Sequence, residues 1–332
     1  MPVRLWRRRG RYRDRSGRRD LEEGVDLRVR LGPLELPNPI VAASGTFGHG
    51  DEVARLCDPA ELGAVTVKSL APYEWPGNPP PRLHPASSDS MLNSVGLQGP
   101  GVEAWVEHEL PALRDRGARV IASLWGRTVD DFGLAAKMLH PARARIVAVE
   151  VNVSCPNLED RSRMFAHAPD TTAAAVSAVA DAGLGVPVFA KLSPNVAALA
   201  DIAGAALNAG ATGLTLVNTV LGLLVDATRR RPVLGAGGGG LSGPAIKPVA
   251  LRAVHEVARA YPGTPIIGTG GVTTGVDAAE MLLVGATAVG VGTATFHDPR
   301  APIRIARELA RWCDRHHVSR VTALVGALED HG

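Results

Sequence analysis

The chain has 332 residues, and its hydrophobic fraction of 45% can supply the core of one large domain or two ordinary ones. Only 21% of residues are charged, and 37 glycines and 25 prolines are scattered along the chain, which excludes disordered, coiled-coil and fibrous proteins. The formal net charge is +3. Residues 1–20, with nine arginines and two aspartates, contribute +7, and residues 21–332 contribute −4. The folded body therefore lacks the basic surface that nucleic-acid binding needs.

The first 25 residues are an arginine-rich tail, which we predict to be a disordered, solvated extension. Contact with an acidic partner or with anionic lipid is the alternative for this tail. It has no apolar stretch after its arginines, so it is not a secretory signal, and no segment approaches the ~18 apolar residues of a membrane span. We therefore expect a cytoplasmic protein with no membrane span and no nucleic-acid partner, in which residues 26–332 form a single domain.

Next along the chain, Leu27–Leu31 and Leu34–Leu36 flank Gly32-Pro33 and predict a β-hairpin. From residue 40 onward, aliphatic and β-branched runs alternate with alanine-rich helical segments. The predicted strands are Ile40–Ala43, Ala64–Lys68, Val120–Leu124, Ile146–Asn152, Val188–Leu192, Gly213–Val217, Pro265–Gly268 and Ala288–Val291. The predicted helices are Asp51–Leu56, Gly101–Gly117, Val129–Leu139, Thr171–Ala182, Ala197–Ala209, Lys247–Ala260, Val276–Val284 and Ala301–His316.

Eight strand-helix alternations indicate an α/β fold of the (β/α)8 TIM-barrel type, with the hairpin as a lid on the barrel floor. A doubly wound sheet is the alternative, but the first strand is not followed by the expected GxGxxG turn. In a barrel, function lies where the strands end. The strand ends here carry small, amide and lysine residues, which suit a large, polar, planar ligand: Ser44-Gly45, Lys68-Ser69, Asn152, Lys191, Asn218-Thr219, Gly270-Gly271 and Gly292-Thr293.

Lysine is rare in this chain, which has 32 arginines and four lysines. Two of the four, Lys68 and Lys191, end predicted strands, where an ammonium could stabilise a developing anion as a compact charge. A rim lysine paired with a carboxylate is the alternative.

Three dispersed cysteines cannot form a disulfide framework, a zinc site or an iron-sulfur cluster, so no metal site is predicted. Cys155 follows the fourth strand in a proline-containing loop, where an ionised thiol could act as a base. A buried, inert thiol is the alternative for Cys155. Cys57 and Cys313 fall at or within predicted helices and are expected to be structural.

Two glycine-rich segments and four asparagines complete the predicted mouth. Six glycines in residues 235–243 and the Thr-Gly-Gly-Val segment after the seventh strand could cradle a phosphate, although glycine could also mean simple loop mobility. Amides both donate and accept hydrogen bonds, so they can bind a ring with alternating C=O and N–H groups. Taken singly, each asparagine is a candidate turn or cap residue. The four are Asn93, Asn152, Asn157 and Asn218.

From about residue 36 to residue 316 the chain resembles the class 1 dihydroorotate dehydrogenases. The motifs that carry the resemblance are Ala-Ser-Gly-Thr-Phe-Gly (43–48), Val-Lys-Ser (67–69), Asn-Ser-Val-Gly-Leu-Gln (93–98), Asn-Val-Ser-Cys-Pro-Asn (152–157), Lys-Leu-Ser-Pro-Asn (191–195), Asn-Thr (218–219), Gly-Gly-Leu-Ser-Gly-Pro-Ala-Ile-Lys-Pro (239–248), Gly-Thr-Gly-Gly-Val (268–272) and Val-Gly-Thr-Ala (291–294).

The resemblance implies an enzyme of pyrimidine biosynthesis that binds one FMN and oxidises dihydroorotate to orotate. Cys155 stands where class 1 enzymes have the base that removes the C5 proton, while hydride leaves C6 for flavin N5; Lys68 would assist. Implied FMN-binding residues are Ala43, Ser44, Gly45, Lys68, Ser69, Asn152, Lys191, Val217, Gly243, Gly270, Gly271, Gly292 and Thr293. Implied substrate-binding residues are Lys68, Asn93, Gly96, Leu97, Asn152, Asn157, Asn218 and Thr219.

Within class 1, residues 240–251 are most similar to class 1B, whose catalytic subunit works with a second subunit carrying FAD and a [2Fe-2S] cluster. With three dispersed cysteines this chain cannot hold that cluster itself. The resemblance thus implies an NAD-linked enzyme with such a partner subunit, and a homodimer. The chain departs from the family pattern in its arginine-rich tail and in the charged loop 158–168.

Two other enzyme classes remain open from the residues alone. One is an FMN barrel that reduces another pyrimidine, such as a uracil-type base or a tRNA uridine. The other is a flavin-free, phosphate-binding isomerase or aldolase, with Lys191 as a Schiff-base nucleophile. A non-enzymatic, tail-mediated binding module is a further alternative, but it gives the mouth residues no role.

Overall fold

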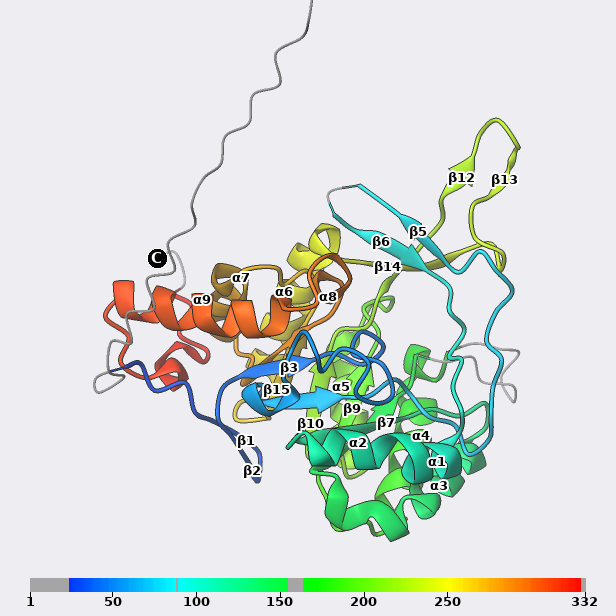
Figure 1. Ribbon diagram of the computed structural model, residues 1–332, viewed down its shortest axis with the longest axis horizontal. Coiled ribbons are helices and arrows are strands. Elements are labelled where there is room, and N and C mark those ends of the chain that lie inside the picture. The colour runs from blue at the N-terminus through cyan, green and yellow to red at the C-terminus, as the bar shows by residue number, and fades with distance from the viewer. Residues whose placement is uncertain (1–23, 88, 155–163, 330–332) are drawn as a thin grey trace, which may run out of the picture.

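The computed structural model describes residues 24–87, 89–154 and 164–329. Its centre is a closed barrel of eight parallel strands, which confirms the predicted TIM-barrel architecture (Figure 1). Around the barrel the strands follow chain order: β3 (Ile40–Ala42), β4 (Ala64–Thr66), β7 (Val120–Leu124), β8 (Ala148–Asn152), β9 (Val188–Leu192), β10 (Gly213–Leu216), β15 (Ile266–Thr269) and β16 (Ala288–Val291).

Every residue of these eight strands is buried. Each strand faces the barrel interior on one side and the surrounding helices on the other, so both faces exclude water. That double burial explains why the strands read in the sequence as continuous apolar runs. It also means that the few polar residues inside them, such as Glu150 and Lys191, need partners within the protein.

The helices that surround the barrel are α1 (Val102–Ala104), α2 (Leu110–Asp115), α3 (Val129–Met138), α4 (Pro169–Ala180), α5 (Leu199–Asn208), α6 (Lys247–Ala260), α7 (Gly275–Leu283), α8 (Ala294–His297) and α9 (Ala301–Arg315). A π-helical segment, Trp105–Glu109, joins α1 to α2. Short 3₁₀ turns lie at Pro59–Glu61, His140–Arg145, Phe165–His167, Pro244–Ile246 and Val321–Leu324. Capping boxes begin α3, with Thr128 and Asp131, and α7, with Thr274 and Asp277.

The predicted helix Asp51–Leu56 is wrong. This segment is a series of turns followed by the 3₁₀ turn Pro59–Glu61. Its hydrogen bonds mostly span three residues, for example from Leu56 N–H to the Val53 carbonyl oxygen at 2.9 Å. Only a few residues separate Gly50 from Pro59, which is too short a segment to offset the cost of starting an α-helix.

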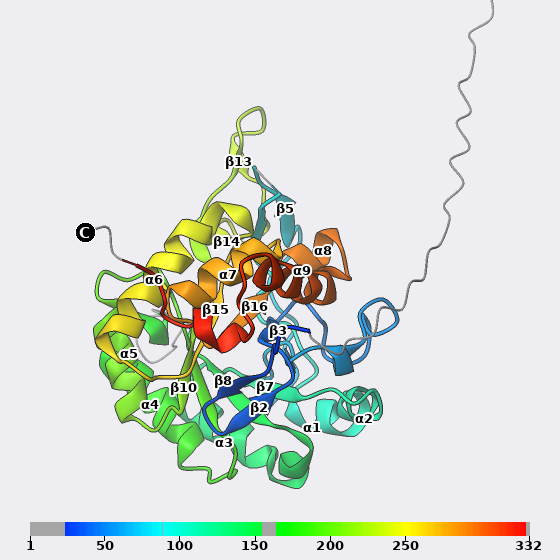
Figure 2. The same ribbon diagram turned by 90° about the vertical axis from the view of Figure 1, so that its left-hand side faces the viewer.

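The predicted hairpin is present as β1 (Val29–Leu31) and β2 (Leu34–Leu36), paired antiparallel. At its tip Gly32 has φ +61°, and a Cβ there would lie 3.3 Å from Thr212 and 3.4 Å from Pro265, which precede β10 and β15. The hairpin thus covers the end of the barrel at which the strands begin, as predicted. Figure 2 shows it on the side of the molecule away from β5 and β14.

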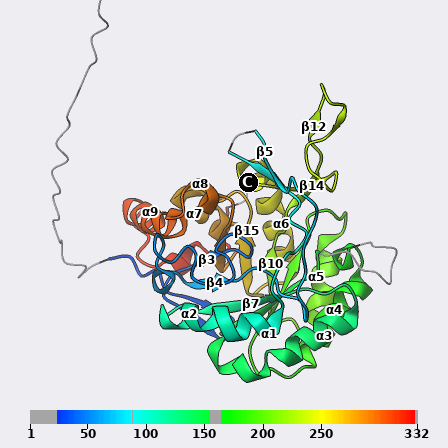
Figure 3. The ribbon, with the colours of Figure 1, turned by 45° about the vertical axis from the view of Figure 1, so that its right-hand side comes forward.

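A second sheet lies across the other end of the barrel, in the order β11-β14-β6-β5 (Figure 3). Its strands are β5 (Leu83–Pro85), β6 (Met91–Asn93), β11 (Val220–Gly222) and β14 (Gly239–Ser242). A further hairpin of β12 (Val225–Asp226) and β13 (Arg231–Pro232) projects beyond it. The predicted elements did not include this sheet. Part of the glycine-rich segment 235–243, which was expected to be a loop, is strand β14 of this sheet and lies over the barrel mouth.

Candidate active site

A cavity of about 920 Å³ lies between the ends of the barrel strands and the second sheet. It brings together residues that are far apart in the sequence, all of them predicted at the mouth: Ala43, Ser44, Gly45, Lys68, Ser69, Asn93, Gly96, Leu97, Asn152, Lys191, Val217, Asn218, Thr219, Gly243, Gly270, Gly271, Gly292 and Thr293. Two further predicted residues, Cys155 and Asn157, lie outside the described residues. The roles assigned to individual residues stay predictions.

The charge of the cavity is positive. Among the described residues that line it, the charged side chains are Lys68, Arg127 and Lys191, and there is no aspartate or glutamate. Arg127 stacks on Trp75, with its guanidinium carbon 4.7 Å from the ring centre. Such a lining favours an anionic ligand, because its cations can offer positive charge and hydrogen-bond donors to the ligand.

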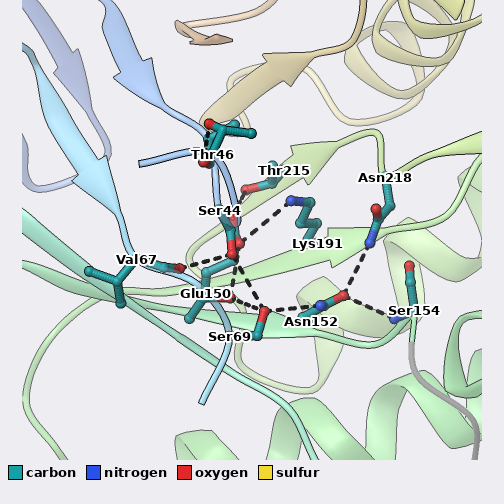
Figure 4. A network of polar contacts seen from close by, with 12 residues as sticks. Ser44, Thr46, Val67, Ser69, Glu150, Asn152, Ser154, Lys191, Thr215 and Asn218 are labelled. Carbon is teal, nitrogen blue, oxygen red and sulfur yellow. Dashed lines mark hydrogen bonds and ion pairs between the residues drawn. The ribbon is translucent and has the colours of Figure 1, made fainter. Parts of the chain in front are cut away.

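Asn152 is held at the cavity floor by three neighbours (Figure 4). Its Nδ2 donates to Ser69 Oγ at 3.1 Å, and its Oδ1 accepts from Asn218 Nδ2 and from the Ser154 N–H, each at 3.2 Å. Asn218 Oδ1 in turn accepts from the Thr219 N–H at 2.8 Å. These bonds fix which end of each amide is donor and which is acceptor, so a ring bound beside them meets a defined pattern.

Lys191 reaches the cavity from β9 and pairs with a buried acid that the sequence analysis did not single out. Its Nζ lies 3.9 Å from Glu150 Oε1 on the neighbouring strand β8. Thr215 Oγ1 donates to Glu150 Oε2 at 2.9 Å, and Ser123 Oγ donates to Oε1 at 3.2 Å (Figure 4). Glu150 and Asn152 are two residues apart on one strand, so their side chains lie on the same face. Because Asn152 was predicted to lie at the mouth, this spacing could have shown that Glu150 also points into the barrel.

Lys68 differs from Lys191 in its charged neighbours. No carboxylate among the described residues forms an ion pair with it. Burial lowers the pKa of Lys68, and the positive charges of Lys191 and Arg82 lower it further. The pKa of His49 is lowered to about 4, chiefly by burial and then by the charge of Lys68.

The turn after β15 is fixed from below by ion pairs. Gly270 and Gly271 have φ values of +136° and +75°, and a Cβ on Gly271 would lie 2.5 Å from Lys247 Cβ. Lys247 Nζ lies 2.7 Å from Asp277 Oδ1, and Asp277 Oδ2 accepts the N–H groups of Thr273 and Thr274 at 2.9 and 2.8 Å. Burial raises the pKa of Asp277, but these hydrogen bonds outweigh it and lower the pKa to about 2.

Sequence reasoning also missed Arg127 and Asn195 in the cavity lining. Asn195 Nδ2 donates to the Thr219 carbonyl oxygen at 3.0 Å and its Oδ1 accepts from the Leu221 N–H at 2.9 Å, which ties the loop after β9 to that after β10. Each of the two residues comes three positions after the end of a barrel strand, and this spacing could have placed both at the mouth. Cys57 and Cys313 are buried, and burial raises the pKa of Cys57 to about 11, in agreement with the predicted structural role.

The comparison with known families gives a single answer: the family model described as dihydroorotate dehydrogenase matches residues 26–312. The chain belongs to the dihydroorotate dehydrogenase family. Membership removes the isomerase or aldolase alternative. The Glu150 ion pair offers a physical reason, because a paired, charged Lys191 ammonium is not a nucleophile.

Two similar relatives carry different names for the electron acceptor. The chain is 47% identical over 303 residues to "Putative dihydroorotate dehydrogenase A (fumarate)" of Solibacter usitatus, which covers 91% of this chain and 98% of the relative. It is 43% identical over 304 residues to "Dihydroorotate dehydrogenase B (NAD(+)), catalytic subunit" of Geobacter sp. (strain M21), covering 92% and 98%. The corresponding subunit of Geobacter sulfurreducens is 42% identical over 304 residues.

Within the described residues, no group of three or more histidine, cysteine, aspartate or glutamate side chains is arranged to hold a metal ion. Nor does any described helix have the length and apolar character needed to cross a membrane.

Proposed function

We propose that this member of the dihydroorotate dehydrogenase family binds one FMN in the cavity and oxidises (S)-dihydroorotate to orotate, a step of pyrimidine (UMP) biosynthesis. The observation that carries the proposal is the lining of the cavity: three cations, no described carboxylate, and a set of oriented amides. Residues 26–332 would form the single FMN-binding domain, working in the cytoplasm.

The residues of the cavity fit FMN. About 920 Å³ accommodates a cofactor and a small substrate together. Thr269 Oγ1 and Ser154 Oγ are buried without a hydrogen-bond partner among the described residues, and both residues line the cavity, so polar atoms of a ligand would complete them. At Gly45, with φ +86°, a Cβ would meet no atom within 4 Å, which leaves this wall open to a flat ring.

Two parts of the lining would hold different parts of FMN. The phosphate is assigned to the glycine turns and Thr293, because their backbone can approach an anion closely: Gly243, Gly270, Gly271 and Gly292. The ring is assigned to Ala43, Ser44, Gly45, Ser69, Asn152 and Val217, with Lys68 and Lys191 at its polar edge. When bound, FMN supplies the acceptor for two electrons and one proton in the form of hydride.

The substrate would be bound through its ring amides and its carboxylate. Asn93, Asn152, Asn157 and Asn218 can pair with the C=O and N–H groups of the ring, together with Thr219 and the backbone of Gly96 and Leu97. Asn93 is already oriented, because its Nδ2 donates to the Gly240 carbonyl oxygen at 3.1 Å. The cations of the lining attract the substrate carboxylate.

Oxidation of the C5–C6 bond removes a proton from C5 and a hydride from C6. Cys155 would take the proton on its sulfur as the thiolate, and FMN, when bound, would supply the acceptor for the hydride, so charge and electrons balance. Lys68 and Lys191 favour the product side, since both place positive charge where negative charge develops.

For the electron acceptor we infer NAD, reached through a partner subunit that holds FAD and a [2Fe-2S] cluster, with two copies of this chain as a homodimer. The support is the similarity of residues 240–251 to class 1B and the names of the Geobacter relatives. The Solibacter relative, named for fumarate, supplies the competing acceptor. Steady-state oxidation of dihydroorotate with NAD or fumarate, with and without added partner, separates the two.

The deciding experiment is the visible spectrum of the purified protein without oxygen, before and after dihydroorotate is added. The proposal expects a flavin band that bleaches. A flavin band that stays oxidised would move the substrate to another pyrimidine. A protein that takes up no FMN on reconstitution would overturn the cofactor assignment.

A further inference from the structure

We propose that Glu150 is a positioning residue: its buried carboxylate holds Lys191 as the charged group at the cavity floor and sets the donor direction of the hydrogen bonds that orient Asn152. The inference deepens the proposed function, and it rests on that function for the identity of the ligand. Glu150 itself does not line the cavity, so it would act through these two neighbours.

The strand register brings five polar side chains together. Parallel pairing places Ser123 of β7 opposite Glu150 of β8, and Lys191 of β9 opposite both Asn152 of β8 and Thr215 of β10. Residues opposite one another on neighbouring strands share a face of the sheet, and residues two apart on one strand do so too. Four consecutive strands thus aim this polar cluster into the barrel, directly below the cavity.

Burial makes the pairing energetically necessary. Glu150 is 2% exposed and Lys191 is 6% exposed. A buried carboxylate is strongly destabilising unless a cation and hydrogen-bond donors surround it, and a buried ammonium has the same requirement. Ser123 and Thr215 supply donors to Glu150, and Lys191 supplies the cation.

The separation of 3.9 Å between Lys191 Nζ and Glu150 Oε1 is that of an ion pair without a short hydrogen bond. The charge of Lys191 is therefore balanced, while its N–H donors remain available to a ligand above it.

The charge of Glu150 also dictates hydrogen-bond direction. A carboxylate only accepts, so Ser123 must donate its hydroxyl proton to Glu150. In the 2.9 Å contact between Ser69 Oγ and Ser123 Oγ, Ser69 must then be the donor. Ser69 Oγ is left as an acceptor for Asn152 Nδ2. The chain of donors that ends at Glu150 therefore supports the same amide orientation that the Ser154 N–H requires, with Asn152 Oδ1 facing Ser154 and Asn218.

Lys68 provides the contrast within the same cavity. It lacks an ion-pair partner among the described residues, and the positive charge of Lys191 helps to lower its pKa. Without Glu150, two uncompensated buried lysines would face the cavity together. The neighbouring acid thus determines which of the two lysines has an ion-pair partner beside the ligand.

The test is a double-mutant cycle with Glu150→Gln, Lys191→Met and the two combined, on FMN-loaded protein. The readout is sulfite affinity, because sulfite adds to oxidised flavin as an anion and bleaches it, so its dissociation constant responds to positive charge beside the ring. Glu150→Gln keeps the shape of the side chain and removes its charge, so Lys191 loses the ion-pair partner that holds its ammonium at the cavity floor. We expect the sulfite dissociation constant to rise about tenfold, as for movement of one positive charge away from the ring; a direct effect of the lost negative charge would lower it instead.

In the Lys191→Met background the same Glu150→Gln change should not raise the sulfite dissociation constant, because no lysine remains to be displaced. An equal rise in both backgrounds, or no rise in either, would overturn the proposal. Thr215→Val is the matched control, since it removes one hydrogen bond from Glu150 and leaves the charge; its effect should be smaller. Glu150→Asp, which keeps the charge, should restore most of the affinity.

A second readout separates this inference from the proposed function. Thermal unfolding of the flavin-free protein is measured for the same four proteins of the cycle. Coupling between the two positions in Tm then reports the ion pair directly. If the wild-type protein binds no FMN, the proposed function fails, and additive changes in Tm would overturn the positioning role as well. If FMN binds but the cycle shows no coupling in either readout, only the role of Glu150 fails.

Discussion

The guanidinium of Arg127 lies over the ring of Trp75, and the Trp75 indole N–H donates to the carbonyl oxygen of Gly96 at 3.0 Å. One aromatic side chain thus holds both a cavity cation and the loop that carries Gly96 and Leu97. Leu97 has φ +63°, a conformation that non-glycine residues adopt only when neighbouring contacts stabilise it. The cation and the loop therefore belong to one wall of the cavity.

Replacing Arg127 should weaken substrate binding more than it slows chemistry. We expect Arg127→Met to raise the KM for dihydroorotate about tenfold, as for loss of one charge-assisted contact to the substrate carboxylate, with little change in kcat. Arg127→Lys keeps the charge but loses the planar stack on Trp75, so its KM should lie between those of wild type and Arg127→Met. Steady-state kinetics measure both constants; a fall in kcat at unchanged KM would place Arg127 elsewhere in the reaction.

The barrel and the residues at its mouth could be predicted because both follow from local rules. Strands buried on both faces read as apolar runs, and strand ends converge on one mouth wherever the strands lie in the sequence. The segment Asp51–Leu56 was mispredicted because its helical composition cannot offset the cost of starting a helix within the eight residues between Gly50 and Pro59.

The second sheet and Glu150 could not be predicted in the same way. β14 is Gly-Gly-Leu-Ser, a sequence with low strand propensity that becomes a strand only because β6 and β11 lie on either side of it. A glutamate within an apolar run is usually exposed at an edge. Its inward direction depends on Ser123, Thr215 and Lys191, which come from three other strands.

Asp277 links the stability of helix α7 to the shape of the glycine turn after β15. Asp277→Asn would remove the charge that pairs with Lys247. It would also weaken the hydrogen bonds that the side chain accepts from the backbone N–H groups of Thr273 and Thr274. We expect unfolding free energy to fall by ~2 kcal/mol and FMN to bind less tightly, because the turn at Gly270 and Gly271 loses its support. Urea unfolding and FMN titration measure the two effects.

Glu280→Gln is the control for Asp277. Glu280 also pairs with Lys247, at 2.8 Å, but its side chain is more exposed and it caps no backbone. Its loss should therefore cost less than ~1 kcal/mol and leave FMN affinity nearly unchanged. If the two variants behave alike, the total charge around Lys247 matters and the cap does not.

His49 should make stability depend on pH in the mildly acidic range. Its pKa is about 4 in the folded protein and ~6.5 in an unfolded chain, so the unfolded state binds the proton first as pH falls. The contribution is fully present above pH ~6.5 and is lost as pH falls toward 4; allowing for partial exposure, we expect ~1–2 kcal/mol. Urea unfolding of wild type and His49→Gln at pH 7 and 4.5 should show a smaller pH effect in the variant. Equal effects would assign the pH dependence to other groups.

Cys155 should control flavin reduction through its thiolate. For wild type, we expect the rate of flavin bleaching by dihydroorotate to rise with pH as the thiol ionises, toward an ordinary pKa of ~8.5. Cys155→Ala should lower that rate about a hundredfold or more, since a general base typically contributes this much. Cys155→Ser should keep a weak activity displaced to higher pH, because a hydroxyl ionises less readily than a thiol. Anaerobic stopped-flow measurements across the pH range give these rates, and a Cys155→Ala protein that bleaches as fast as wild type at every pH would assign the C5 proton to another base.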